Sequence, residues 1–221
     1  MAELIPDIQL QDNTEQRLAC VLVLDGSSSM HGEKIDKLNE GLKSLEQALK
    51  DDDAASSRVQ MLVIRIGGNA EADIITDWTD AMNWQAPTIE ANGMTPLGEG
   101  AKTGLKCIEQ QKKKYQANGI SYNRPWMILI SDGEPNDSWE GIADDCREAE
   151  DKNKVTIFPI GVEGADMQIL SKFSNKSAIK LEGLQFNELF IWLSKSLSTR
   201  SQASTGDNIQ LPAVGWGEAS V

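Results

Sequence analysis

Continuous apolar runs alternate with amphipathic stripes along this chain. The runs are six to eight residues long and carry no regular polar position, which is typical of strands buried on both faces of a parallel sheet. They lie at Cys20–Asp25 (CVLVLD), Val59–Ile66, Pro125–Ser131 and Val155–Val162. After the first run, apolar residues recur at steps of three and four and predict an amphipathic helix. Its stripe consists of Ile35, Leu38, Leu42, Leu45 and Leu49.

The same alternation of strand and helix continues to the end of the pattern. Further helices are expected from Leu97, around Trp139–Ala149, near Met167–Phe173, and on the face carrying Phe186, Leu189, Phe190, Leu193 and Leu197. Two shorter strands are expected at Ala72–Thr76, as a hairpin partner of the second run, and at Ala178–Leu181. The pattern predicts an α/β fold with a doubly wound, mostly parallel sheet, one antiparallel edge strand and helices on both faces.

The length of 221 residues fits one such domain. We expect an N-terminal arm over residues 1–16, the globular domain over 17–200, and a C-terminal tail over 201–221 that contains no Lys or Arg. In that tail, Leu211 and Trp216 are expected to pack on the domain or to be recognised by a partner. The triple Asp51-Asp52-Asp53 is expected in the loop that ends the first helix.

Charge and cysteine content narrow the classes of function. The chain has 34 acidic and 21 basic residues, a net charge of −13, which argues against nucleic acid and anionic membranes as partners. The three cysteines, Cys20, Cys107 and Cys146, are odd in number, lie in apolar stretches, and are expected to be reduced and buried. The N-terminal residues do not resemble a secretion signal, and the expected location is cytoplasmic.

Three polar loops carry the candidate chemistry, because ligands of such folds bind where the strands end. They are DGSSSM (25–30), ANGMTPLGEG (91–100) and SDGEPND (131–137). In an extended first loop the hydroxyls of Ser27 and Ser29 would point the same way, with the Asp25 carboxylate beneath them. Thr95 and Asp132 are positioned to complete a shell of oxygen ligands, which is the set that Mg²⁺ prefers.

These motifs together resemble the metal-ion-dependent adhesion site of the von Willebrand factor A family. The carriers are D-x-S-x-S after the first strand, the segment Gly93 to Gly98, and the strand-terminal S-D-G, and the resemblance runs from about Gln16 to Thr199. Ser28 departs from the pattern, since many members have Gly there. The resemblance implies a Rossmann-like sheet and a divalent cation, Mg²⁺ or else Mn²⁺ or Ca²⁺, bound directly by Ser27, Ser29 and sometimes Thr95.

The resemblance also implies that Asp25 and Asp132 bind the cation mostly through water. An ion with few direct carboxylate ligands keeps its positive charge and attracts an Asp or Glu of a protein partner as its last ligand. The segments NTEQRLACVLVLD and ANGMTPLGEG most resemble the bacterial tellurium-resistance (TerY-like) branch. That branch implies a cytoplasmic stress-response adaptor with kinase and phosphatase partners.

Other interpretations of these residues stay open. His31 and Glu134 are candidates for the partner-binding rim, although an exposed loop residue and a solvated acid are the plainer interpretations. Glu134 and Asp137 together would suit a second cation or a simple turn around Pro135.

Two other functions compete with a metal-dependent binding module. A Mg²⁺-dependent phosphohydrolase also places an Asp after the first strand, but it needs an acid where this chain has Ser27. The single histidine excludes sites that need two, and no nucleophile is paired with a general base, so we expect no enzymatic activity. A metal-independent scaffold of the same fold is the remaining alternative.

Overall fold

The computed structural model describes residues 15–69, 71–132, 134–204, 207, 210–215 and 217–219. The predicted N-terminal arm lies almost wholly outside this described part, and Trp216 of the predicted tail lies outside it as well. Within the described part, no helix is both long and apolar enough to cross a membrane.

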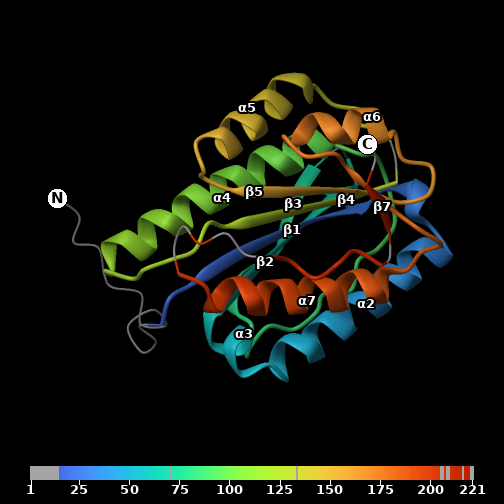
Figure 1. Cartoon of the computed structure of the whole chain (residues 1–221). Coiled ribbons are helices and arrows are strands. Elements are labelled where there is room, and N and C mark those ends of the chain that lie inside the picture. Colours follow the sequence, from blue (N-terminus) through green and yellow to red (C-terminus); the bar gives the residue numbers. More distant parts are fainter. Residues whose placement is uncertain are drawn as a thin grey trace.

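A single mixed sheet forms the centre of the molecule (Figure 1). Its strand order is β3-β2-β1-β4-β5-β6-β7. The strands are β1 (Leu18–Gly26), β2 (Val59–Gly67), β3 (Glu71–Asp80), β4 (Trp126–Ser131), β5 (Thr156–Gly161), β6 (Ile179–Leu181) and β7 (Gly217–Ala219). Strands β2, β1, β4, β5 and β6 are parallel, and β3 pairs antiparallel with β2. This confirms the predicted mostly parallel sheet with an antiparallel edge. The three-residue β7, antiparallel to β6, is an addition that the pattern did not predict.

Helices cover both faces of the sheet, as predicted. They are α2 (Glu33–Lys50), α3 (Asp53–Arg58), α4 (Leu97–Ala117), α5 (Glu140–Asp151), α6 (Met167–Leu170) and α7 (Phe186–Gln202), with short 3-10 turns η1 (Ser28–Met30) and η2 (Ser171–Phe173). Figure 1 shows α2, α3 and α7 on one face and α4, α5 and α6 on the other. Each predicted helix is present within a few residues of its expected bounds.

The triple aspartate was only partly predicted. Asp51 does end α2, but Asp52 begins a further helix, because its carboxylate accepts the main-chain N–H of Ala55 at 2.7 Å. A carboxylate in this position satisfies a main-chain donor at the helix N-terminus, which stabilises even a six-residue helix such as α3.

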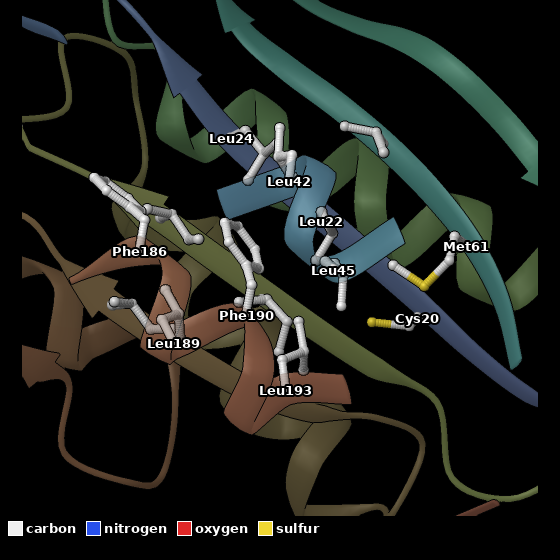
Figure 2. Packing of buried hydrophobic residues seen from close by; sticks show 14 of the residues in the cluster. Cys20, Leu22, Leu24, Leu42, Leu45, Met61, Phe186, Leu189, Phe190 and Leu193 are labelled. Atoms are coloured by element: carbon white, nitrogen blue, oxygen red, sulfur yellow. The ribbon is translucent and has the colours of Figure 1, made fainter. Parts of the chain in front are cut away.

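Strand β1 contributes to two separate hydrophobic cores because alternate side chains point to opposite faces. Leu22 and Leu24 pack with α2 and α7, where Leu42, Phe186 and Phe190 meet them (Figure 2). On the other face, a second cluster joins Val21 and Val23 to Leu97, Ala101 and Ile108 of α4. All nine residues of β1 are buried, which explains the unbroken apolar run. The three cysteines are free and buried, as predicted.

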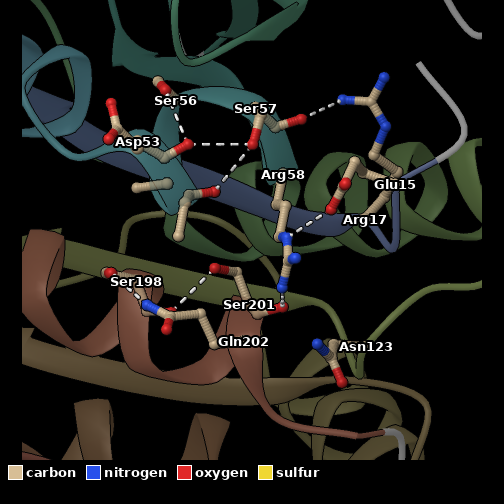
Figure 3. A network of polar contacts seen from close by, with 12 residues as sticks. Glu15, Arg17, Asp53, Ser56, Ser57, Arg58, Asn123, Ser198, Ser201 and Gln202 are labelled. Atoms are coloured by element: carbon tan, nitrogen blue, oxygen red, sulfur yellow. Dashed lines mark hydrogen bonds and ion pairs between the residues drawn. The ribbon is translucent and has the colours of Figure 1, made fainter.

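A polar network anchors the beginning of β1. Arg17 is fully buried, and its Nη1 donates to the Ser57 carbonyl at 3.0 Å and to Asp80 Oδ1 at 3.1 Å. Figure 3 shows Arg58 from α3 bridging Glu15 and the Ser201 carbonyl near the end of α7. The network ties β1 to helices on one face of the sheet, at the N-terminal ends of the parallel strands. The candidate site lies at the opposite, C-terminal ends of these strands.

Candidate metal centre

The strand order reverses between β1 and β4, which are adjacent and parallel. The chain leaves β1 toward β2 on one side, whereas β4 continues toward β5 on the other, so the loops after β1 and β4 diverge and leave room between them. Asp25 is the next-to-last residue of β1, and Asp132 directly follows β4. Ser131 Oγ donates to Asp25 Oδ2 at 2.5 Å, which joins the two strand ends.

The first loop brings its two candidate serines together. Residues 28–30 form a 3-10 turn instead of the expected extended loop, and buried Met30 anchors that turn in the core. Ser27 keeps extended dihedral angles, and its Oγ lies 2.9 Å from Ser29 Oγ. The hydroxyls therefore converge as predicted although the backbone between them is tighter. Ser28, the departure from the family pattern, is exposed at the outside of the turn.

Asp132 links the serine loop to a cation of the chain itself. Ser29 Oγ donates to Asp132 Oδ1 at 2.6 Å, and Lys34 Nζ contacts Asp132 Oδ2 at 2.5 Å. The same ammonium donates to the Glu163 carbonyl after β5, at 2.9 Å. The Asp132 side chain is fully buried, whereas that of Lys34 is 24% exposed. Sequence reasoning missed Lys34.

A signal for Lys34 is nevertheless present in the sequence. It is a cation in the first turn of α2, where the helix dipole favours acids such as Glu33 and Asp36. A lysine in this unfavourable position indicates a compensating anionic partner.

Asp25 is held entirely by donors of the chain. Its Oδ1 accepts the main-chain N–H of Ser27 at 2.8 Å, and its Oδ2 accepts the Ser131 hydroxyl. Burial raises the pKa of the Asp25 carboxyl, the hydrogen bonds from Ser131 and Ser27 lower it, and the negative charge of Asp132 raises it again, for a net increase. With both oxygens used in this way, Asp25 is suited to supporting the loop from below and not to nucleophilic attack.

Main-chain hydrogen bonds connect the segment around Thr95 to the other two loops, and no described hydrogen bond joins the Thr95 hydroxyl to the serine cluster. Gly93, two residues earlier, has φ of +77° and accepts the Ser28 N–H at 3.0 Å. A Cβ on Gly93 would lie 1.8 Å from the Gly68 carbonyl oxygen, so glycine is required where these two segments cross. Thr95 itself is buried, and its carbonyl accepts the Asn136 N–H of the third loop at 3.2 Å. All three loops are thereby joined.

Three further predictions concern the rim. Asp137 does not form a second cation site or a solvated turn, because its carboxylate accepts the main-chain N–H groups of Gly98 at 3.2 Å and Glu99 at 2.7 Å. It caps the N-terminus of α4 from another loop. His31 and Glu134 are exposed beside the cluster, and their predicted contact with a partner stays a prediction.

The spacing of the cluster suits a small hard cation. Neighbouring ligands of octahedral Mg²⁺ lie about 3.0 Å apart, given metal–oxygen distances of about 2.1 Å. The Ser27 and Ser29 hydroxyl oxygens have this separation, and Asp132 Oδ1 lies next to Ser29. Among the described residues, no group of three or more His, Cys, Asp or Glu side chains is placed to hold a metal ion. The cluster instead combines serine hydroxyls with two carboxylates, Asp25 and Asp132.

Comparisons with known proteins agree with the fold. A sequence model of the von Willebrand factor type A domain matches residues 20–188. No curated protein sequence matches the chain. The pilus adhesin SpaC of Lactobacillus rhamnosus GG has a similar structure, with 14% identity and a TM-score of 0.66, over 85% of this chain and 32% of the adhesin.

Two more solved structures are similar. Proximal thread matrix protein 1 of the mussel byssus, described with a zinc-occupied MIDAS motif, is 14% identical with a TM-score of 0.53, over 84% of this chain and 49% of that protein. The ArnB paralog VWA2 of Sulfolobus acidocaldarius is 19% identical with a TM-score of 0.53, over 83% and 46%. The chain thus spans less than half the length of each of these three proteins, and the likeness concerns the fold.

Proposed function

Because the chain belongs to the von Willebrand factor type A domain family, we propose that it is a protein-interaction module whose partner binding depends on a divalent cation at the Ser27–Ser29–Asp132 cluster. The 2.9 Å separation of the Ser27 and Ser29 hydroxyl oxygens, together with Asp132 at 2.6 Å from Ser29, is the observation that carries this proposal. The zinc-occupied motif of the mussel protein supports a metal at this place in the fold.

Each residue has a distinct task in this proposal. Ser27, Ser29 and Thr95 supply uncharged oxygen ligands, while Asp25 and Asp132 supply charge through water and orient the serines. A cation bound in this way supplies an electrophilic position for a carboxylate of the partner. Asp25 and Asp132 already accept hydrogen bonds from the chain, which favours their indirect role.

The metal proposal is tested by calorimetric titration with Mg²⁺, Mn²⁺ and Zn²⁺. Ser29→Ala removes one proposed ligand. We expect at least a tenfold loss of affinity, since one hydrogen bond to a charged group already contributes about 1.5–3 kcal/mol. The matched control is Ser28→Ala, one residue away and exposed, which should bind like wild type. Equal affinities for both variants, or no binding to wild type, would sink the proposal.

The partner proposal has a separate test. A pull-down from the native organism is compared with and without EDTA, and between wild type and Asp132→Ala. We expect capture to need both the metal and Asp132. A partner retained in EDTA with unchanged affinity would show that recognition does not use the cation.

A metal-independent scaffold is the second candidate, and a specific contact favours it. The Lys34 ammonium already neutralises Asp132 at 2.5 Å, which stabilises the loops without a divalent ion. The same titrations decide between the two functions, since a scaffold would bind no divalent ion and would keep its partner in EDTA.

A finer proposal concerns the biological setting. We place the module in the bacterial tellurium-resistance (TerY-like) branch, as a cytoplasmic stress-response adaptor with kinase and phosphatase partners. The amino-acid sequence of ANGMTPLGEG, and that of the segment that leads into β1, support this proposal. Deletion of the gene should lower tolerance to tellurite, and unchanged tolerance in the deletion strain would refute the assignment.

A further inference from the structure

A hollow of about 930 Å³ lies where β4 and β5 begin, at the opposite ends of the strands from the proposed metal centre. Its walls come from the segment entering β4 around Arg124, the segment before β5 around Lys154, and Arg200 near the end of α7. Asp207 and Leu211, which follow α7, close one side. This volume is in the range of sites for cofactor-sized ligands, which is about 300–1,000 Å³.

The charge of this hollow is opposite to that of the whole chain. The protein carries −13, yet six of its 21 basic side chains line this one hollow. They are Lys112, Arg124, Lys152, Lys154, Lys176 and Arg200, and Asp207 is the one acidic residue among the lining residues described. A concave surface with one sign of charge concentrates counter-ions of the other sign.

Half of these cations are already neutralised by neighbouring glutamates. Lys112 pairs with Glu109, Lys152 with Glu148, and Lys176 with Glu150 at 3.5 Å. The other three, Arg124, Lys154 and Arg200, make no ion pair within the part of the chain that the structure describes. Their charges are available to an anion in the hollow.

Arg200 is held in position although it lacks an ion pair. The Asn123 side-chain amide donates to the Arg200 carbonyl at 2.8 Å and to the Ala203 carbonyl at 3.3 Å, which fixes the end of α7; Figure 3 shows Asn123 beside this end. The Arg200 Nη1 donates to the Asp207 main-chain carbonyl at 2.9 Å, while the Asp207 carboxylate accepts the Ser204 N–H.

The two arginines of the hollow repel one another. Burial lowers the pKa of Arg200, the positive charge of Arg124 lowers it further, and Asp207 acts in the opposite direction. Arg124 is exposed and donates to the Asn153 side-chain oxygen, a neutral partner. A bound anion would relieve the repulsion, and guanidinium groups match the oxygens of phosphate with paired hydrogen bonds.

An apolar wall accompanies the cations. The Trp126 and Phe158 rings pack at a centroid distance of 4.9 Å, and Lys176 lies 5.0 Å from the centre of the Phe158 ring. Leu211 is half-buried and packs against the core cluster that contains both rings. The hollow therefore offers a charged end and an apolar end to one ligand.

We propose that this hollow binds a small phosphate-bearing molecule, with its phosphate groups at Arg124, Lys154 and Arg200 and its organic part toward Phe158 and Leu211. The proposal does not depend on the metal centre, which lies at the other edge of the sheet. Pyrophosphate, ADP and adenosine separate the two ends of the ligand, and EDTA in all titrations keeps divalent cations out of the comparison.

We expect pyrophosphate and ADP to bind, ADP more tightly, and adenosine not to bind at millimolar concentration. Arg124→Gln should weaken pyrophosphate binding about tenfold, because a hydrogen bond to a charged group is lost. The matched control Lys37→Gln removes the same charge from an exposed lysine on α2 and should have no effect. Arg124 is exposed, so its variant should keep the wild-type circular dichroism and Tm.

Several results would overturn the proposal. They are the absence of pyrophosphate and ADP binding, equal affinity in wild type and Arg124→Gln, tight binding of adenosine, and binding of long polyanions such as RNA alone. Loss of pyrophosphate binding in Asp25→Ala would locate the anion at the metal centre and would overturn it equally.

Discussion

Lys34 should limit the affinity of the proposed metal centre for divalent cations. Its ammonium and the Ser29 hydroxyl bind the two oxygens of the same carboxylate, at 2.5 and 2.6 Å. These contacts and the width of a carboxylate place Lys34 Nζ within about 7 Å of Ser29 Oγ. At that separation, a unit and a divalent charge repel by about 1 kcal/mol in water and by about 5 kcal/mol at an effective dielectric constant near 20.

The partial exposure of Lys34 favours the lower end of this range. We therefore expect Lys34→Met to strengthen Mg²⁺ binding by about 1.4 kcal/mol, which is about tenfold in Kd. The substitution also frees one oxygen of Asp132, which acts in the same direction. Lys37→Met is the matched control, because it removes an exposed lysine on the next turn of α2 whose partner is Glu40.

Calorimetric titration with Mg²⁺ measures the effect directly, and the rise in Tm with added Mg²⁺ measures it independently. Affinity that is unchanged in Lys34→Met would mean that the charge of Lys34 is screened from the site. Weaker binding in a folded Lys34→Met variant would mean that Lys34 mainly orients Asp132, and either result would refute the reasoning.

Three further predictions concern the framework of the site. Gly93→Ala should lower both Tm and Mg²⁺ affinity, since a residue with φ of +77° strains the backbone by about 1–2 kcal/mol before its Cβ clash is counted; a variant with wild-type Tm would contradict this. Arg17→Met should cost about 1.5–3 kcal/mol in urea unfolding, because the partly buried Asp80 carboxylate loses its charged hydrogen-bond partner and keeps only Gln60 among the described residues, and a loss below about 0.5 kcal/mol would contradict the contact. Burial raises the pKa of Cys146 to about 12 and also raises that of Cys20, so at pH 8 both should remain protonated and should react with a thiol reagent only after unfolding; rapid labelling of Cys20 or Cys146 in the native protein would contradict this.

The fold could be predicted because apolar residues follow different patterns in its strands and in its helices, and because each pattern extends over many residues. Strand β1 is buried on both faces, so its run is continuously apolar, whereas the stripe of α2 recurs with the helical period. Short elements have no such signal. The six-residue α3 depends on one cap at Asp52, and β7 depends on pairing with β6, which is remote in the sequence.

Only the part of the candidate site that follows from the order of the strands could be predicted. Topology brings Asp25 and Asp132 to one edge, because β1 and β4 are parallel neighbours, and the small polar residues of the loops then indicate oxygen ligands. The contacts of Lys34 and Asp137 depend on how separate loops approach each other in space. Periodicity within a single segment carries no information about that approach, so both residues were missed or assigned another role.

The arrangement of charge is consistent with an electrophilic cation at the proposed metal centre of a strongly acidic chain. If acidic side chains gathered at the loops, they would bind a cation directly and neutralise it. This chain instead places two carboxylates, Asp25 and Asp132, within the serine cluster, ties both to its own donors, and adds a lysine that repels a cation. Under the proposed function, these contacts should make the cation bind weakly and attract a partner's carboxylate strongly. A variant that binds Mg²⁺ more tightly, such as Lys34→Met, should therefore hold an acidic partner less strongly per bound ion.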